Sequence, residues 1–225
     1  MYFDSTYLIL IPAILFALWA QSRVKSTYAK YSREFAGLTG AEAARMVLEM
    51  NGVNDVDIRP IAGELTDHFD PKTNTISLSQ GVYNVTSVAA VGIAAHEAGH
   101  AVQYAVGYSP IKLRTAIIPV TNIGSTLSWP LLLIGVLLGN QTLAMAGVVL
   151  FCAVVLFQLV TLPVEFNASN RALDTLGASG YLQPEQLNGA AKVLRAAAMT
   201  YVAALAQALA QLLRLLMIAR RSRRD

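Results

Sequence analysis

The distribution of apolar residues divides the chain into three long apolar stretches and one segment of ordinary composition. The longest stretch runs from Thr115 to Val164, where fifty consecutive residues include no Asp, Glu, Lys, Arg or His. A membrane-spanning helix needs about 20 apolar residues, so this stretch accommodates two spans joined by a tight turn. The turn is expected at Gly139-Asn140-Gln141. The pattern therefore predicts a transmembrane hairpin over residues 115–164.

A shorter apolar stretch near the N-terminus predicts a further span. Residues 7–20 contain no charge and are followed by Arg23 and Lys25. A cleaved signal peptide carries its basic residues before the apolar run, whereas here they come after it. We therefore expect an uncleaved transmembrane helix within residues 1–20.

The third apolar stretch lies near the C-terminus, and its polar residues favour a helix that does not cross the membrane. Residues 196–219 contain a single charge, Arg214, which forms one helical stripe with Gln207 and Gln211. A cluster of arginines follows, and exporting such a cluster would violate the positive-inside rule. We expect residues 165–225 to form a C-terminal helical part that ends in an apolar or interfacial helix.

Composition and charge indicate a membrane protein with a part in the cytoplasm. Hydrophobic residues make up 55% of the chain and charged residues only 14%, against about a quarter charged in soluble domains. The net charge of +3 comes from basic residues beside apolar segments, which predicts contact with the lipid bilayer and no nucleic-acid partner. Lys and Arg lie near both ends of residues 21–114 and are absent from the hairpin turn. By the positive-inside rule, we expect residues 21–114 and the chain after Val164 to lie in the cytoplasm. Nothing in the pattern indicates an oligomeric state.

Residues 21–114 have the composition of a small α+β domain. Thr39 and Glu42 form a capping-box pattern, and Ser87 is a candidate N-cap. Alternating polar and apolar residues predict a half-buried strand over 75–79, after a turn-rich segment. The predicted elements are helices over 40–51 and 85–106 and strands over 55–61, 65–69 and 75–79. The predicted fold class is mainly α with a small sheet.

The second helix of this domain contains the motif with clear chemistry, His96-Glu97-Ala98-Gly99-His100. In an H-E-x-x-H motif the two histidines lie one turn apart on one helix face and can bind one zinc ion. Glu97 can reach a water on that ion and act as general base. Two of the chain's three histidines fall in this motif, so a chance match is the weaker interpretation. We expect one Zn²⁺ ion bound by His96 and His100.

A catalytic zinc usually has a third protein ligand, and the sequence offers two candidates. His68 is the remaining histidine, and Glu165 follows directly after the uncharged stretch. A hairpin that leaves and re-enters the cytoplasm returns Glu165 to the membrane face of His100, which favours Glu165. Pro163 predicts the start of its helix and Gly177 the end. The alternative is that Glu165 only stabilises a helix N-terminus through the helix dipole.

These segments together resemble the YugP-like family of membrane zinc metallopeptidases. The resemblance rests on residues 96–100 followed by the hairpin and residues 162–173, with further similarity at 65–71 and 200–204. It implies a neutral zinc peptidase in a bacterial cell membrane. The layout is also similar to gluzincin-type membrane proteases, which typically carry Glu-x-x-Ala-Asp. Here Ser169 stands where that Asp would be, so the partners that orient the histidines are expected among Asp67, Asp70 and Asp174.

The expected function is a membrane-bound zinc endopeptidase that hydrolyses peptide bonds in peptides or membrane proteins, with Glu97 as general base. Candidate oxyanion donors are His68, Arg171 and Tyr201, and the strand over 75–79 could pair with an extended substrate. One alternative is a non-catalytic membrane scaffold in which His68 closes a structural four-ligand zinc site. Another is a zinc hydrolase acting on non-peptide amides or lipids, because activated water serves any such attack.

Overall fold

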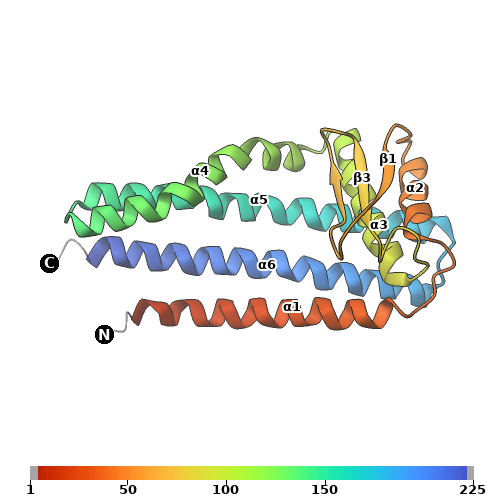
Figure 1. Cartoon of the computed structure of the whole chain (residues 1–225), viewed down its shortest axis with the longest axis horizontal. Helices are drawn as coiled ribbons and strands as arrows, with labels where there is room; N and C mark the ends of the chain where they lie inside the picture. The colour runs from red at the N-terminus through yellow and green to blue at the C-terminus, as the bar shows by residue number, and fades with distance from the viewer. Residues whose placement is uncertain (1–4, 222–225) are drawn as a thin grey trace. The chain divides into compact units, whose positions relative to one another are not determined.

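The computed structural model describes residues 5–221, which form two compact units built from segments distant in the sequence (Figure 1). Within the described residues, the helical unit comprises residues 5–20, Lys112–Leu162 and residues 200–221. The α+β unit comprises Gln21–Ile111 and Pro163–Met199. Four long helices contribute residues to both units: α1 (Ile11–Tyr31), α4 (Ser109–Leu137), α5 (Gln141–Ser179) and α6 (Pro184–Arg221).

The α+β unit contains a three-stranded sheet whose central strand is the strand predicted from alternation. The strand order is β1-β3-β2, with β1 parallel and β2 antiparallel to β3. The side chains of Ile76 and Leu78 in β3 are fully buried, as are Val47 and Leu48 from the neighbouring helix. The elements are α2 (Gly40–Met50), β1 (Asp57–Ile61), β2 (His68–Asp70), β3 (Thr75–Ser79) and α3 (Val88–Ala105).

Helices α2 and α3 begin where their caps predict. The Thr39 N–H donates to Glu42 Oε2 at 2.7 Å, and the Glu42 N–H donates to Thr39 Oγ1 at 3.2 Å, which completes the capping box. Ser87 Oγ accepts the Ala90 N–H at 3.2 Å at the start of α3. Helix α3 is the buried centre of the unit, because most of its residues are excluded from solvent.

Two of the predicted boundaries are wrong. No helix begins at Pro163, because α5 continues from Gln141 through Pro163 to Ser179. A proline inside a helix is tolerated when neighbouring groups compensate the lost hydrogen bond, as in apolar helices. The strand predicted over 65–69 is observed over His68–Asp70, because Leu65 has a left-handed φ of 54° and belongs to a turn.

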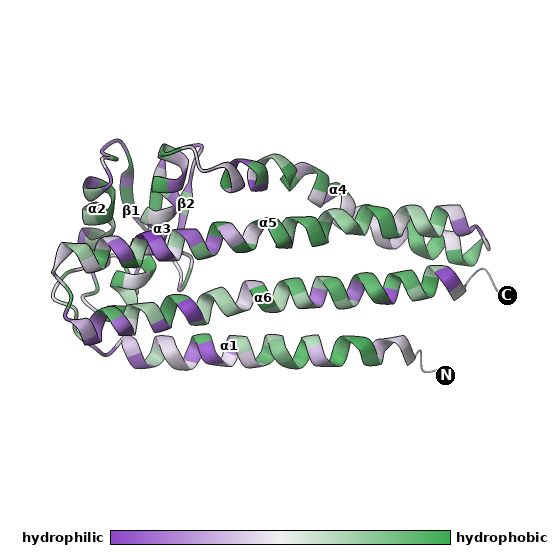
Figure 2. Cartoon of the chain, turned by 180° about the vertical axis from the view of Figure 1, so that it is seen from behind, coloured by the Kyte–Doolittle hydropathy of each residue, from purple (hydrophilic) through white to green (hydrophobic). Residues whose placement is uncertain are grey.

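Among the described residues, four helices are candidate membrane spans, including the predicted N-terminal one. The spans lie within Thr6–Tyr31, Ser109–Leu137, Gln141–Ser179 and Pro184–Arg220, by length and composition. The hairpin segments of α4 and α5 are predominantly hydrophobic (Figure 2). The turn between them includes Gly139, at the predicted place, with a φ of 61° that glycine adopts readily. Helix α6 is long and apolar enough to cross, and the interfacial position of its C-terminal part stays a prediction.

Close packing and one buried arginine stabilise the helical unit. A Cβ at Gly147 would lie 2.5 Å from the carbonyl oxygen of Ser128, so the glycine permits α4 and α5 to approach closely. Arg214, only 5% exposed, places its guanidinium 3.7 Å from the ring centroid of Tyr7. Its Nε also donates to Thr6 Oγ1 at 3.2 Å. The charge of Arg214 is therefore stabilised by the aromatic ring of Tyr7 and the hydroxyl of Thr6.

Candidate metal centre

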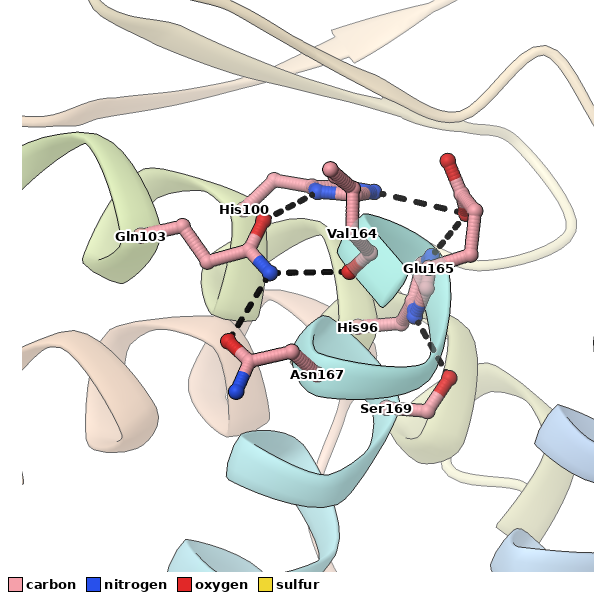
Figure 3. Close-up of polar contacts among 7 residues, drawn as sticks. All are labelled: His96, His100, Gln103, Val164, Glu165, Asn167 and Ser169. Carbon is pink, nitrogen blue, oxygen red and sulfur yellow. Dashed lines mark hydrogen bonds and ion pairs between the residues drawn. The ribbon is translucent and has the colours of Figure 1, made fainter. Parts of the chain in front are cut away.

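The two histidines of the H-E-x-x-H motif and Glu165 converge inside the α+β unit (Figure 3). His96 and His100 lie one turn apart on α3, with ring centroids 4.7 Å apart and planes at 78°. Helix α5 brings Glu165 opposite them, so that Oε2 lies 3.3 Å from His96 Nε2 and 3.7 Å from His100 Nε2. Both imidazoles thus present the same ring nitrogen to one carboxylate oxygen.

The donor set fits a zinc ion. One ligand atom from each of the three residues lies within 4.8 Å of the other two. Donors bound tetrahedrally at about 2.0–2.1 Å from zinc lie about 3.3–3.4 Å apart, close to the two His–Glu separations. Glu165 is 2% exposed and His100 is 9% exposed. Burying a carboxylate this deeply is costly unless cationic partners compensate, and a divalent cation between these ligands would do so.

Gly99 allows Glu165 to reach this position. A Cβ at Gly99 would lie 2.5 Å from the carbonyl oxygen of Ala168, which is closer than side-chain carbons approach backbone oxygens. Helix α5 therefore packs directly on the backbone of α3 at the motif. The second variable position of H-E-x-x-H consequently sets the distance between the helix that carries the histidines and the helix that carries the glutamate.

We expect Gly99→Ala to destabilise the protein by about 1–3 kcal/mol, as overpacking of a tight core does. It should also lower zinc occupancy, because α5 and Glu165 must move away from α3. Thermal unfolding and metal content of the purified variant measure both effects. Gly92→Ala is a matched control on the same helix, since its Cβ would meet Ala190 at 3.4 Å, an ordinary contact. Equal stability and equal zinc occupancy in the two variants would contradict this role for Gly99.

Two uncharged side chains contact the remaining ring nitrogens of the histidines. His96 Nδ1 lies 3.1 Å from Ser169 Oγ, and His100 Nδ1 lies 3.0 Å from Gln103 Oε1 (Figure 3). The expectation of an acidic partner is therefore wrong. Asp67 accepts from the N–H and Oγ of Ser79, and Asp70 from the Lys72 N–H and Thr73 Oγ1. Asp174 is exposed on α5.

The environment of His100 favours positive charge at this position. Burial alone would lower its pKa, but the hydrogen bond to Glu165, the charge of Glu97 and the contact with Gln103 together raise it above the ordinary value. The groups that favour the imidazolium are those that would favour a bound cation. Because metal ligation requires the neutral imidazole, protons and metal compete for His100 Nε2.

The other candidate residues occupy different places. His68 lies in β2, where its Nδ1 is 2.8 Å from the Thr66 carbonyl oxygen, and it is not part of the His96, His100 and Glu165 group found among the described residues. Arg171 Nε donates to Asn167 Oδ1 at 2.9 Å. Tyr201 belongs to the helical unit. Glu97 is half-buried on α3 beside the ligands.

The proposed pairing of substrate with residues 75–79 is wrong. Strand β3 is central in the sheet, with Asp57–Ile61 on one side and His68–Asp70 on the other. Its backbone hydrogen-bonding groups are therefore already used by its neighbours, whereas β1 and β2 are the edge strands. An extended peptide that joins this sheet would pair with one of those edges.

Two histidines of an H-E-x-x-H helix and a glutamate from a later helix form a donor set of the kind found in the His₂Glu sites of zinc metallopeptidases. The chain belongs to the family described as "Putative neutral zinc metallopeptidase", whose model matches residues 6–220. It is 47% identical over 210 residues to a Bacillus subtilis (strain 168) protein named "Putative membrane protease YugP", covering 92% of this chain and 93% of that protein. No solved structure matches the chain.

Proposed function

We propose that this protein is a membrane-bound, zinc-dependent endopeptidase with His96, His100 and Glu165 as ligands. The observation that carries the proposal is the convergence of two imidazole nitrogens and one carboxylate oxygen, beside a motif glutamate that is not part of that group. Three protein ligands leave a fourth zinc position for water or substrate, as in catalytic sites. Membership of the zinc metallopeptidase family supports the same reaction class.

The chemistry follows from the placement of Glu97. A zinc ion held by the three ligands would lower the pKa of water to about 7 and polarise the scissile carbonyl. Glu97 directly follows His96 on α3 and is half-buried there, which is the motif position of the residue that reaches a metal-bound water. As general base, Glu97 takes the proton from that water. It then delivers the proton to the leaving amine, so one residue serves both steps.

Two other functions predict different ligand sets or substrates. A structural zinc site in a scaffold needs four protein ligands, and His68, the expected fourth, is not part of the His96, His100 and Glu165 group found among the described residues. This arrangement favours a catalytic zinc site over a structural one. Hydrolysis of non-peptide amides would use the same ligands and base, so only substrate tests separate it from peptidase activity.

We further propose that the α+β unit faces the cytoplasm and that substrates include membrane proteins with exposed cytoplasmic segments. The basis is the placement of Lys and Arg beside the apolar segments. In a Cys152→Ser background, a cysteine at Lys72 should resist a membrane-impermeant thiol reagent until the cells are permeabilised. A cysteine at Leu138, next to the hairpin turn and 72% exposed, should react in intact cells. The reverse labelling pattern would refute the orientation.

The function is tested with detergent-purified protein on two substrates, casein and a single-span membrane protein with an unstructured cytoplasmic tail. We expect cleavage of both, loss of cleavage after chelation of the metal, and recovery on addition of zinc near the protein concentration. Cleavage of casein alone would remove the membrane-protein substrates from the proposal. Failure to cleave either substrate by zinc-loaded protein would contradict the peptidase assignment.

A further inference from the structure

A continuous chain of hydrogen bonds leads from His100 away from the metal ligands. His100 Nδ1 contacts Gln103 Oε1 at 3.0 Å, and Gln103 Nε2 donates to the Val164 carbonyl at 2.8 Å and to Asn167 Oδ1 at 3.0 Å (Figure 3). Asn167 Oδ1 also accepts from Arg171 Nε at 2.9 Å. The Gln103 side chain is 0% exposed, so water cannot replace these partners.

The chemistry of the groups fixes the direction of every bond in this chain. Arg171 has only donors, so the atom of Asn167 that faces it must be the carbonyl oxygen. That oxygen and the Val164 carbonyl are both acceptors, so Gln103 must turn its NH₂ group toward them. The oxygen of Gln103 is then left for His100, and it can only accept. His100 must therefore carry a proton on Nδ1. In the neutral form that metal ligation requires, this leaves the lone pair on Nε2, which faces Glu165 and the metal position.

We propose that Gln103 is a positioning residue that fixes His100 in the Nδ1–H tautomer, with its own orientation set by Val164, Asn167 and Arg171. This inference rests on the proposed metal site. It adds the residue that fixes the orientation of the His100 ring. A neutral amide here takes the role that a carboxylate often has beside a metal-bound histidine. It does so without adding a second negative charge next to the buried Glu165.

The two histidines are consequently held in different ways. The hydroxyl of Ser169 can donate or accept, so it does not impose one tautomer on His96. Gln103, with both of its amide ends used, imposes one on His100. Removing Gln103 should therefore weaken metal binding more than removing the Ser169 hydroxyl does.

The test compares zinc affinity, by competition with a chromophoric chelator, in full-length protein in detergent. Gln103→Met keeps an unbranched side chain of similar size but leaves the His100 N–H without an acceptor. We expect it to lower zinc affinity by about 10- to 100-fold, the usual effect of losing a partner of a metal-bound histidine. Ser169→Ala should lower affinity less. Gln103→Met within twofold of wild type, or no weaker than Ser169→Ala, would overturn the proposal.

A second pair of variants keeps the proposal testable if Gln103→Met does not fold. Asn167→Asp retains oxygens that accept from Gln103 and Arg171, so its zinc affinity should stay near that of wild type. Asn167→Leu removes the acceptor and should lower zinc affinity. Equal affinities in these two variants would also overturn the proposal. Thermal unfolding of the metal-free proteins identifies any variant whose fold has changed.

Nitrogen-15 NMR of histidine-labelled protein reads the tautomer directly, and the chain has only three histidines to assign. Zinc-loaded wild type should show His100 protonated at Nδ1 and ligated through Nε2. Ligation through Nδ1 would refute the inference even if the enzyme is active. Conversely, protein that shows this tautomer and binds zinc but cleaves nothing would contradict the peptidase function and leave the role of Gln103 intact.

Discussion

Replacing Glu97 with glutamine is expected to lower peptide hydrolysis by about 10²- to 10⁴-fold, the usual contribution of a general base, while zinc stays bound. The amide has nearly the shape of the carboxylate, so the packing of α3 should persist. It cannot take a proton from water, and therefore both the attack and the protonation of the leaving amine lose their catalyst. Cleavage rate and zinc content should be measured on the same protein sample.

The interpretation of Glu97→Gln depends on a control for nonspecific effects of the substitution. Glu49→Gln changes an exposed glutamate of α2 in the same unit and should keep wild-type activity and zinc content. Hydrolysis within tenfold of wild type in zinc-loaded Glu97→Gln would remove Glu97 as general base. It would leave the three ligands untouched, because they are defined by separate contacts.

Replacing Glu165 is expected to have the largest effect on the metal itself. Losing a partner that only orients a ligand costs about 10- to 100-fold in metal affinity, so losing a ligand should cost more than about 100-fold. Glu165→Ala would also leave two buried imidazoles facing a cavity. Glu165→Gln retains the volume and removes the charge, so it separates loss of ligation from loss of packing. Both variants should be purified nearly free of zinc and be inactive.

Two control variants make the Glu165 result specific. Glu185→Ala removes the other glutamate that follows the motif, located in the first turn of α6, and should retain zinc. His68→Ala should also retain zinc, because His68 lies outside the group formed by His96, His100 and Glu165 among the described residues. Zinc that persists in Glu165→Ala and is lost in His68→Ala would replace the proposed ligand set by one that includes His68.

The sequence predicted those parts of the α+β unit in which local signals agree with tertiary packing. The capping box at Thr39 and the N-cap at Ser87 mark the starts of α2 and α3, because each side chain satisfies a backbone N–H that the first helical turn leaves unpaired. Alternation over Thr75–Ser79 predicted a half-buried strand, and β3 forms there, although it is buried on both faces. The four candidate spans include the N-terminal helix and hairpin expected from uncharged stretches alone.

Other features depend on contacts that the sequence pattern does not encode. Pro163 indicated a helix start, whereas α5 runs through it, so that the second half of the uncharged stretch and Glu165 lie on one helix of 39 residues. The partners of the histidines were expected to be acidic and are instead Ser169 and Gln103. Each had a positional signal: Gln103 lies three residues after His100, and Ser169 lies four residues after Glu165, both on the face of the ligand. Because Gln103 and Ser169 are uncharged, they were not among the acidic residues expected as partners of the histidines.

The most direct test of the metal centre is an anomalous-difference map at the zinc absorption edge, from crystals of zinc-loaded, detergent-purified protein. The account predicts one strong peak about 2.0–2.2 Å from His96 Nε2, His100 Nε2 and a carboxylate oxygen of Glu165, with no fourth protein ligand. A peak bound by His68, a closed shell of four protein ligands, or no peak between α3 and α5 would contradict it.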